Sequence, residues 1–302
     1  MTDTPLTETS LTETALKETA LKEKPPLRGG AAKPRSLSQN AFDNIWPPFL
    51  FGGGVIAVWY FVSYVVLSER RRFLLRPPHL VLQNGFFKWP VFSEMLGALW
   101  NSTKVAAIGL LLAIIIGFAL AVIMSQAKML ERAMFPYLVI VQAIPILALT
   151  PLIVFWFGSG QTARIIVCII ISVFPLVVNT LFGLQSAERG MHDLLTLHHA
   201  NRVTRLRKLM FPAALPAIFA GLRISAGLSV IGAIVGDFFF GQGEVGIGQL
   251  IRRYANRLEG EELIAAVILS SLLGVSVFLL FTWLQNRAIG RWYDTSSGAN
   301  AA

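Results

Sequence analysis

Charged residues are scarce in this chain. They make up 14% of its 302 residues, whereas 54% are hydrophobic. A soluble domain normally carries about 25% charged residues, so the composition argues against an ordinary soluble protein. The net charge of +9 then indicates loops that face anionic lipid and a cytoplasmic partner, with no nucleic acid bound.

Several motifs of catalysis and metal binding are also missing. Cys168 is the only cysteine, so the chain has no disulfide framework. It contains no G-x-x-x-x-G-K-[ST] for ATP phosphates and no H-E-x-x-H for zinc. His192, His198 and His199 have no cysteine or carboxylate cluster beside them, so we expect no metal site. GQGEVG at 241–246 matches a dinucleotide-binding pattern, but no strand precedes it, and we expect an extramembrane turn.

Long uncharged runs are abundant. They occupy 46–67, 105–124, 135–158, 165–185 and 263–285, and a sixth run, 217–240, contains only Arg223 and Asp237. A helix that rises about 1.5 Å per residue needs about 20 apolar residues to cross a hydrocarbon core of about 30 Å. Because lipid cannot satisfy backbone polar groups, such runs fold as helices. The sequence therefore predicts an all-α polytopic membrane protein with about six transmembrane helices.

The ends of the chain are polar. Residues 1–40 carry an imperfect five-residue repeat (LTETS, LTETA, LKETA) without the apolar core of a signal peptide, and we expect a disordered cytoplasmic tail. We expect a transmembrane domain over 41–295 and a second disordered tail over 296–302. With six spans, fifteen Lys and Arg residues fall on the side of the termini and ten on the other, Arg164 among the ten. This asymmetry favours cytoplasmic termini.

Spans three and four contain prolines and polar residues. Pro145, Pro151 and Pro175 each remove a helix hydrogen bond, so we expect kinks there. Such breaks are tolerated only against protein or a cavity. Gln142 and Asn179, with Thr180, should face the interior of the bundle. We take Gln142, Pro145 and Asn179 as candidates for a substrate path, with packing hydrogen bonds as the alternative.

Asp237 is the only acid in its apolar stretch. A charge at the bilayer centre costs roughly 2.5–3.5 kcal/mol on insertion scales. Two interpretations stay open: an interfacial residue at the end of span five, or a residue of a gate or substrate path.

A basic, proline-ended patch lies between two apolar runs. It reads HHANRVTRLRKLMFPAALPAIFAGLR over 198–223. The segment from Asp193 to Lys208 is polar and permits a helix, which we expect Pro212 and Pro216 to end, with span five starting at Pro216. Arg223 would then reach the cytoplasmic interface. A short basic helix joined to the next span could act as a lever. The alternative is a basic loop whose only role is to add to the excess of Lys and Arg on the cytoplasmic side.

The same residues resemble a family. DLLTLHHANRVTRLRKLMFPAALPAIFAGLRISAGLSVIGAIVGDFF is similar to the cytoplasmic loop and fifth span of bacterial ABC importer permeases of the nitrate, sulfonate and taurine group, with the related thiamine-precursor and riboflavin permeases. QAIPILALTPLIVFWFGSG, FPLVVNTLFGL, GEVGIGQLI and the RW at 291–292 add to the resemblance, which covers about 75–293. In this family a glutamate is followed by two alanines, and a glycine comes after three further residues. This pattern then leads into LPAALP.

The resemblance implies a type I ABC importer permease fold and a non-catalytic subunit in the bacterial inner membrane. Two ABC ATPase subunits would bind the 186–212 loops, and ATP and Mg would sit on those subunits, with no cofactor in this chain. A second permease copy or a sister permease would complete the path, and an external binding protein would deliver substrate. The family's pattern assigns ATPase coupling to Asp193, His199, Ala200, Arg202, Arg205, Arg207 and Pro212.

Two departures from the pattern bear on coupling. Leu194 and Leu195 replace two small alanines, and His199 replaces the usual glycine, at a turn that histidine makes at some cost. The resemblance implies that the substrate is a small organic anion or a heteroaromatic nutrient. VIGAIVGDFF is more similar to the thiamine-precursor and riboflavin branch than to taurine permeases, which favours the heteroaromatic class. The alternative functions are a self-sufficient secondary transporter or channel, which would need charges deep in its spans, and an intramembrane enzyme, for which no nucleophile with a base is visible.

Overall fold

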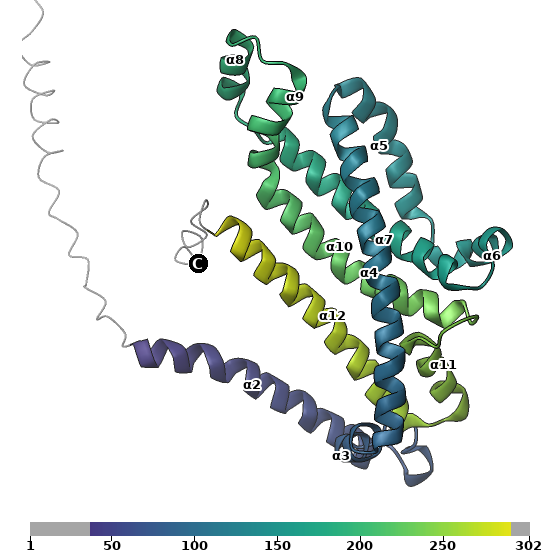
Figure 1. Cartoon of the computed structure of the whole chain (residues 1–302). Helices are drawn as coiled ribbons and strands as arrows, with labels where there is room; N and C mark the ends of the chain where they lie inside the picture. The colour runs from purple at the N-terminus through teal and green to yellow at the C-terminus, as the bar shows by residue number, and fades with distance from the viewer. Residues whose placement is uncertain (1–36, 291–302) are drawn as a thin grey trace, which may run out of the picture. The chain divides into compact units, whose positions relative to one another are not determined.

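The computed structural model describes residues 37–290, and every regular element in this range is a helix (Figure 1). The chain divides into two units, one up to Val55 and one from Ile56 onward. The described part of the first unit is the beginning of α2 (Leu37–Phe61). The tail expected over 1–40 lies outside the described residues except for its last four, which begin α2, and the tail expected over 296–302 lies outside them entirely.

Five helical segments within the described range are long and apolar enough to cross a membrane. They are Trp46–Val66, Trp89–Ser125, Gln161–Gln185, Arg202–Phe239 and Gly260–Ile289, and a sixth span results if the bent pair α5 (Lys128–Ala143) and α6 (Ile146–Phe157) counts as one. The first segment consists of α2 from Trp46 onward and the π-helical turn η1 (Val62–Val66) that continues it. The prediction of an all-α protein with about six transmembrane helices is therefore confirmed.

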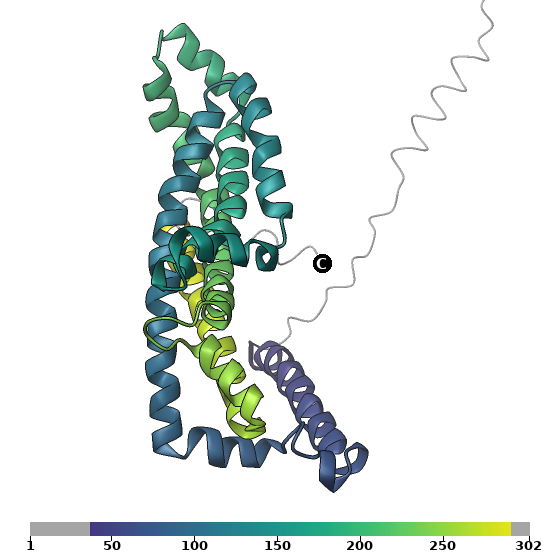
Figure 2. The ribbon, with the colours of Figure 1, turned by 90° about the vertical axis from the view of Figure 1, so that its right-hand side faces the viewer.

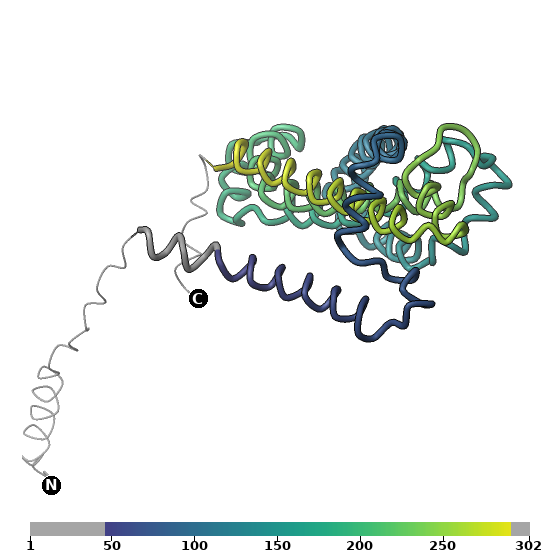
Figure 3. Tube along the Cα trace, turned by 90° about the horizontal axis from the view of Figure 1, so that it is seen from below, coloured from purple at the N-terminus to yellow at the C-terminus, as the bar shows by residue number. Residues whose placement is uncertain are grey.

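The second unit is built around α4 (Trp89–Ser125), α7 (Gln161–Gln185), α10 (Phe211–Phe239) and α12 (Gly260–Ile289). Helices α7 and α10 run antiparallel in close contact, and α4 packs against α7 (Figures 1 and 2). Figure 3 follows the chain as a tube from α2 in purple to α12 in yellow. Small residues let α7 and α10 approach. A side chain at Gly221 would meet Asn179, and one at Gly232 would meet Cys168. This is the close packing that membrane helices achieve with glycine and serine.

The predicted third span is broken in the middle. Helix α5 ends at Ala143, α6 begins at Ile146, and their axes differ by 96°. Pro145 explains the break, because it has no N–H to donate and forces Ile144 into an extended conformation (ψ 123°). By contrast, α6 continues through Pro151 and α7 through Pro175. The Ser225 hydroxyl of α10 donates to the Ser172 carbonyl at 2.7 Å, close to the turn that Pro175 disturbs.

Span five starts earlier than the sequence analysis predicts. Helix α9 (Arg202–Arg205), the π-helical turn η4 (Leu206–Met210) and α10 follow one another without a break, so Arg202–Phe239 is a single helical rod. Pro212 lies in the first turn of α10 and Pro216 inside it, and neither ends the helix. The wider π turn directly before Pro212 accommodates its ring and its missing N–H.

Short elements connect the long helices. They are η2 (Glu69–Arg71), α3 (Pro78–Val81), η3 (Leu82–Phe86), α8 (Arg189–Leu197) and α11 (Ile247–Arg257). The basic segment after the first span is tied back to it, since Arg72 Nε donates to the Ser63 carbonyl at 3.2 Å. Helix α11 packs against α4 and α12, where burial and the Glu94 carboxylate raise the pKa of Tyr254 to about 12.

Candidate functional site

The basic patch forms a helical hairpin at one end of the second unit. Helix α8 and helix α9 are its two arms, and residues 198–201 form the turn (Figure 1). We call residues 189–205 the α8–α9 hairpin. Helix α8 makes few contacts with the long helices, whereas α9 is continuous with the α10 rod. The hairpin is therefore attached to the bundle chiefly through the rod.

The turn of the hairpin is a Schellman motif followed directly by an N-cap. The Ala200 N–H donates to the Leu195 carbonyl at 2.9 Å, and the His199 N–H donates to the Thr196 carbonyl at 3.0 Å. His199 occupies the left-handed position of this motif with φ 51°, where glycine is usual. The Asn201 side chain then accepts from the Thr204 N–H at 2.7 Å and starts α9. The strain expected at His199 is thus present in the backbone.

The predicted coupling residues fall into two groups. Asp193, His199 and Arg202 are exposed on the hairpin, and Ala200 is half-buried in its turn. Arg205 is half-buried and donates to the Thr196 hydroxyl at 2.9 Å, so it joins the two arms. Arg207 and Pro212 lie on the rod, the first exposed and the second half-buried. The structure thus brings five of the seven together in one hairpin and places the other two farther along the rod, which Arg202 and Arg205 begin.

Helix α8 also presents an apolar face. Met191, Leu194 and Leu197 recur every third residue and are exposed by 50%, 50% and 78%. Val203 of α9 is 70% exposed. Leu194 is one of the two leucines that depart from the family's small alanines, while Leu195 is half-buried. An exposed apolar face beside exposed cations is typical of a protein contact surface.

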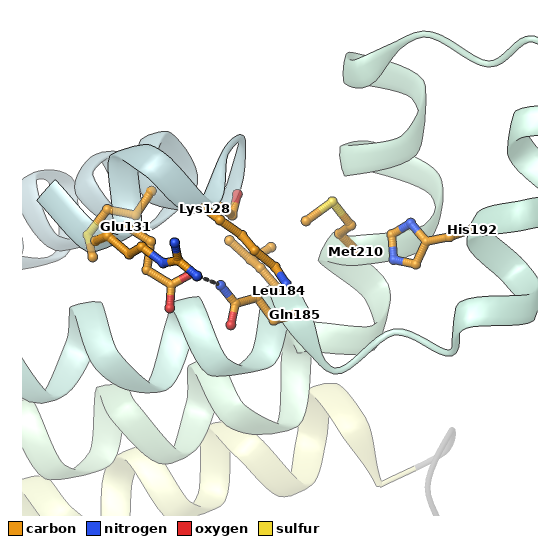
Figure 4. A pocket seen from close by; sticks show the side chains of 9 residues that line it. Lys128, Glu131, Leu184, Gln185, His192 and Met210 are labelled. Atoms are coloured by element: carbon orange, nitrogen blue, oxygen red, sulfur yellow. Dashed lines mark hydrogen bonds between the residues drawn. The ribbon is translucent and has the colours of Figure 1, made fainter. Parts of the chain in front are cut away.

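A polar hollow of about 600 Å³ lies between the hairpin and the adjacent helix ends (Figure 4). Lys128, Glu131 and Arg132 of α5 line it together with Gln185 of α7 and His192 of α8. Gln185 Nε2 donates to the Glu131 carboxylate at 2.7 Å. The hollow therefore lies between α8 and the adjoining ends of α5 and α7.

The predicted path residues do not form one group. Gln142 and Pro145 are exposed at the break between α5 and α6 and line a hollow of about 270 Å³ with Ile170 and Ile171 of α7. Asn179 lies at the α7–α10 contact instead, where its amide donates to the Pro175 carbonyl at 2.7 Å. This bond lies within α7. It corresponds to the alternative in which Asn179 makes a packing hydrogen bond.

Asp237 is buried inside the bundle, close to the end of α10. Its side chain has no exposed area, and its Oδ1 lies 3.2 Å from Arg164 Nη1, which is itself 2% exposed. The second carboxylate oxygen accepts from the Ser102 hydroxyl of α4. A buried acid needs such partners because an unpaired buried charge is costly.

Arg164 is the functional candidate that the sequence analysis misses. It lies one residue before the run 165–185 and counts there among the loop cations of one membrane side. Its side chain instead lies inside the bundle and donates to the carbonyls of Phe240, Gln242 and Glu244. The sequence does contain a signal for Arg164. A buried acid near the end of one apolar run requires a cation near the corresponding end of another run, and Arg164 lies at that end of the run 165–185.

Comparison with known proteins places the chain in a family. Residues 109–290 match the family described as "Binding-protein-dependent transport system inner membrane component". The chain is 34% identical over 271 residues to the riboflavin transport system permease protein RibX of Chloroflexus aurantiacus, covering 86% of this chain and 95% of RibX. It is 36% identical over 182 residues to the formylaminopyrimidine transport permease protein ThiX of Halalkalibacterium halodurans, covering 60% of this chain and 72% of ThiX.

A solved structure supports the same fold. It is described as an amino acid ABC transporter with histidines, and one of its chains superposes with a TM-score of 0.50 at 17% identity, covering 65% of this chain and 94% of that one. The resemblance recognised in the basic patch is therefore confirmed. The chain belongs to the binding-protein-dependent transport system inner membrane components, the membrane-spanning permeases of ABC importers.

Proposed function

We propose that this chain couples ATP hydrolysis on separate ATPase subunits to substrate import, and that the α8–α9 hairpin is the contact. The observation that carries the proposal is the continuity of the rod. Arg202, exposed at the hairpin, and Asp237, buried near the far end, belong to one unbroken helical segment. A push on the hairpin therefore has a rigid route across the bundle, because a helix transmits displacement along its axis.

The surface of the hairpin fits a protein partner. Its exposed apolar side chains would be buried by a groove on each ATPase, and Asp193 and Arg202 would form the polar rim. ATP and Mg would be held by the partners, since the chain has no phosphate-binding loop. The hollow beside His192 would allow the hairpin to tilt as the ATPases close.

The remaining parts of the proposal concern assembly and membrane orientation. Two permeases, identical or sister chains, would enclose the path, with the break at Ile144 and Pro145 facing it. The hairpin and both termini would lie in the cytoplasm, as the lysine and arginine asymmetry favours. An external binding protein would deliver a small organic anion or a heteroaromatic nutrient; the names of the riboflavin and formylaminopyrimidine relatives support the heteroaromatic class.

A self-powered transporter finds less support. Such a protein would need a membrane charge free to bind the coupling ion. Among residues 46–290, the two charged side chains that are fully buried, Arg164 and Asp237, bind each other instead.

Mild-detergent purification of the tagged chain from its own host tests the proposal. We expect a stoichiometric P-loop ATPase, identified by mass spectrometry. Leu197→Asp should lower the recovered ATPase at least about tenfold, because it places a charge in an apolar contact. Leu258→Asp is the matched control, since Leu258 is also exposed (65%) but follows α11 at the opposite end of the rod. Equal recovery from both variants would contradict contact through the hairpin.

A further inference from the structure

The loop between α10 and α11 combines exposure with an unusual anchor. Four consecutive residues, 241–244, are exposed. From inside the bundle, the Arg164 guanidinium donates to three carbonyls of the 240–246 loop: Nε to Phe240 at 3.1 Å, Nη2 to Gln242 at 2.9 Å and Nη1 to Glu244 at 2.8 Å. Exposed loops are usually mobile, whereas this one is held by a buried cation.

Asp237 connects this anchor to the long helices. It pairs with Arg164 Nη1, and it accepts from Ser102 of α4, whose hydroxyl in turn accepts from the Ile247 N–H at 2.8 Å. The network therefore joins α4, α7, α10, the 240–246 loop and the first residue of α11. Two glycines close it tightly: a side chain at Gly246 would meet the Asp237 carboxylate, and one at Gly248 would meet the Ile234 carbonyl.

Helix packing alone does not require these charges. Elsewhere α7 and α10 contact each other through small, uncharged residues, such as Gly221 against Asn179 and Gly232 against Cys168. A buried ion pair is seldom more stabilising than apolar residues of the same volume. An arginine can, however, direct several donors to several carbonyls at once, which neither an apolar side chain nor a lysine can do in that planar geometry. The arrangement is suited to fixing a loop.

We infer that Arg164 is a positioning residue which, held by Asp237, locks the 240–246 loop and the adjoining ends of α7 and α10 into one unit. Movement of the α10 rod then carries the loop with it, without a hinge between Phe239 and the loop. The consequence for transport rests on the proposed function, in which the rod receives work at the α8–α9 hairpin. The positioning of the loop by Arg164 does not depend on it.

Cross-linking in membranes tests the positioning directly. The Gln242 N–H donates to the Ser159 carbonyl at 3.1 Å, so Ser159→Cys with Gln242→Cys, in a full chain carrying Cys168→Ala, should react rapidly with a short bifunctional thiol reagent. Arg164→Met should slow this reaction at least about tenfold, as expected from the loss of hydrogen bonds to a charged donor. Arg164→Lys should have an intermediate effect.

A second cysteine pair separates local from general unfolding. Thr196→Cys with Arg205→Cys lies in the α8–α9 hairpin, where the native Arg205 Nη2 and Thr196 Oγ1 atoms are 2.9 Å apart. Its reaction should be the same in the parent chain and in the chain carrying Arg164→Met. An undiminished 159–242 reaction in the Arg164→Met chain would overturn the inference, and so would an equal loss at both pairs.

Rescue tests the functional consequence. The complex purified with its own ATPase and placed in vesicles of host lipid should hydrolyse ATP more slowly with Arg164→Met, and the 159–242 cross-link should restore the rate. In the parent with Arg164 the same cross-link should leave the rate unchanged; if it stopped hydrolysis, the loop would have to move relative to α7, and the inference would be wrong. Absence of any ATPase from the parent complex would instead contradict the proposed function.

Discussion

The Arg205 guanidinium of α9 donates a hydrogen bond at 2.9 Å to the Thr196 hydroxyl of α8. That hydroxyl donates in turn to the His192 carbonyl at 2.8 Å. Arg202, one turn earlier on the same short helix, is exposed. Two arginines of one basic cluster therefore differ in their surroundings: Arg205 joins the two arms of the hairpin, and Arg202 faces solvent.

Replacing these arginines should have separable effects. Arg205→Met is expected to lower the opening free energy of the hairpin by about 0.5–1.5 kcal/mol, the net value of one hydrogen bond. Arg202→Met should leave it unchanged. Hydrogen exchange of the peptide containing residues 196–205, followed by mass spectrometry, measures both. Equal protection in the two variants would show that Arg205 does not join the arms.

The left-handed residue of the hairpin provides a second prediction. His199→Gly should stabilise the turn by about 1 kcal/mol, because glycine adopts positive φ without the steric cost that a side chain incurs. His198→Gly is the matched control: His198 has φ −80°, so glycine there adds only chain flexibility. Hydrogen exchange of the Ala200 N–H, which donates to the Leu195 carbonyl, should slow in the first variant alone. Slower exchange in both variants would show that the positive φ of His199 does not destabilise the turn.

The close packing of α7 against α10 leads to a third prediction. A methyl group at Gly232 would lie 2.9 Å from the Cα of Cys168, whereas one at Gly227 would meet nothing within 4 Å. Gly232→Ala should therefore destabilise the bundle by about 1–3 kcal/mol through overpacking. Gly227→Ala should be neutral or slightly stabilising, by up to about 1 kcal/mol. Thermal unfolding of the two variants in the same detergent compares them, and similar melting temperatures would exclude a tight contact at Gly232.

Much of the fold follows from one-dimensional patterns. Uncharged runs place the long helices, since each run must satisfy its backbone within itself. The effect of a proline depends on its neighbours and is harder to predict. Pro145 breaks its span because it forces Ile144 into an extended conformation, whereas Pro212 and Pro216 follow a π turn within a continuous rod.

The buried ion pair shows where sequence reasoning stops. Asp237 is recognisable as an acid that needs a partner, but Arg164 is 73 positions away and lies just outside an apolar run. Only the antiparallel packing of α7 and α10 brings the two together. The hairpin, by contrast, is local: its cap, its turn and its exposed cations depend on residues close in sequence, so the basic patch and the strain at His199 were predictable.

Coupling through the α8–α9 hairpin is tested most directly by photocross-linking in the host. A benzophenone amino acid in place of Leu197, the most exposed apolar residue of α8, should form an adduct with a P-loop ATPase, identified by mass spectrometry. The same probe in place of Leu258 should form none. An ATPase adduct from position 258, or only lipid adducts from position 197, would contradict coupling through the hairpin.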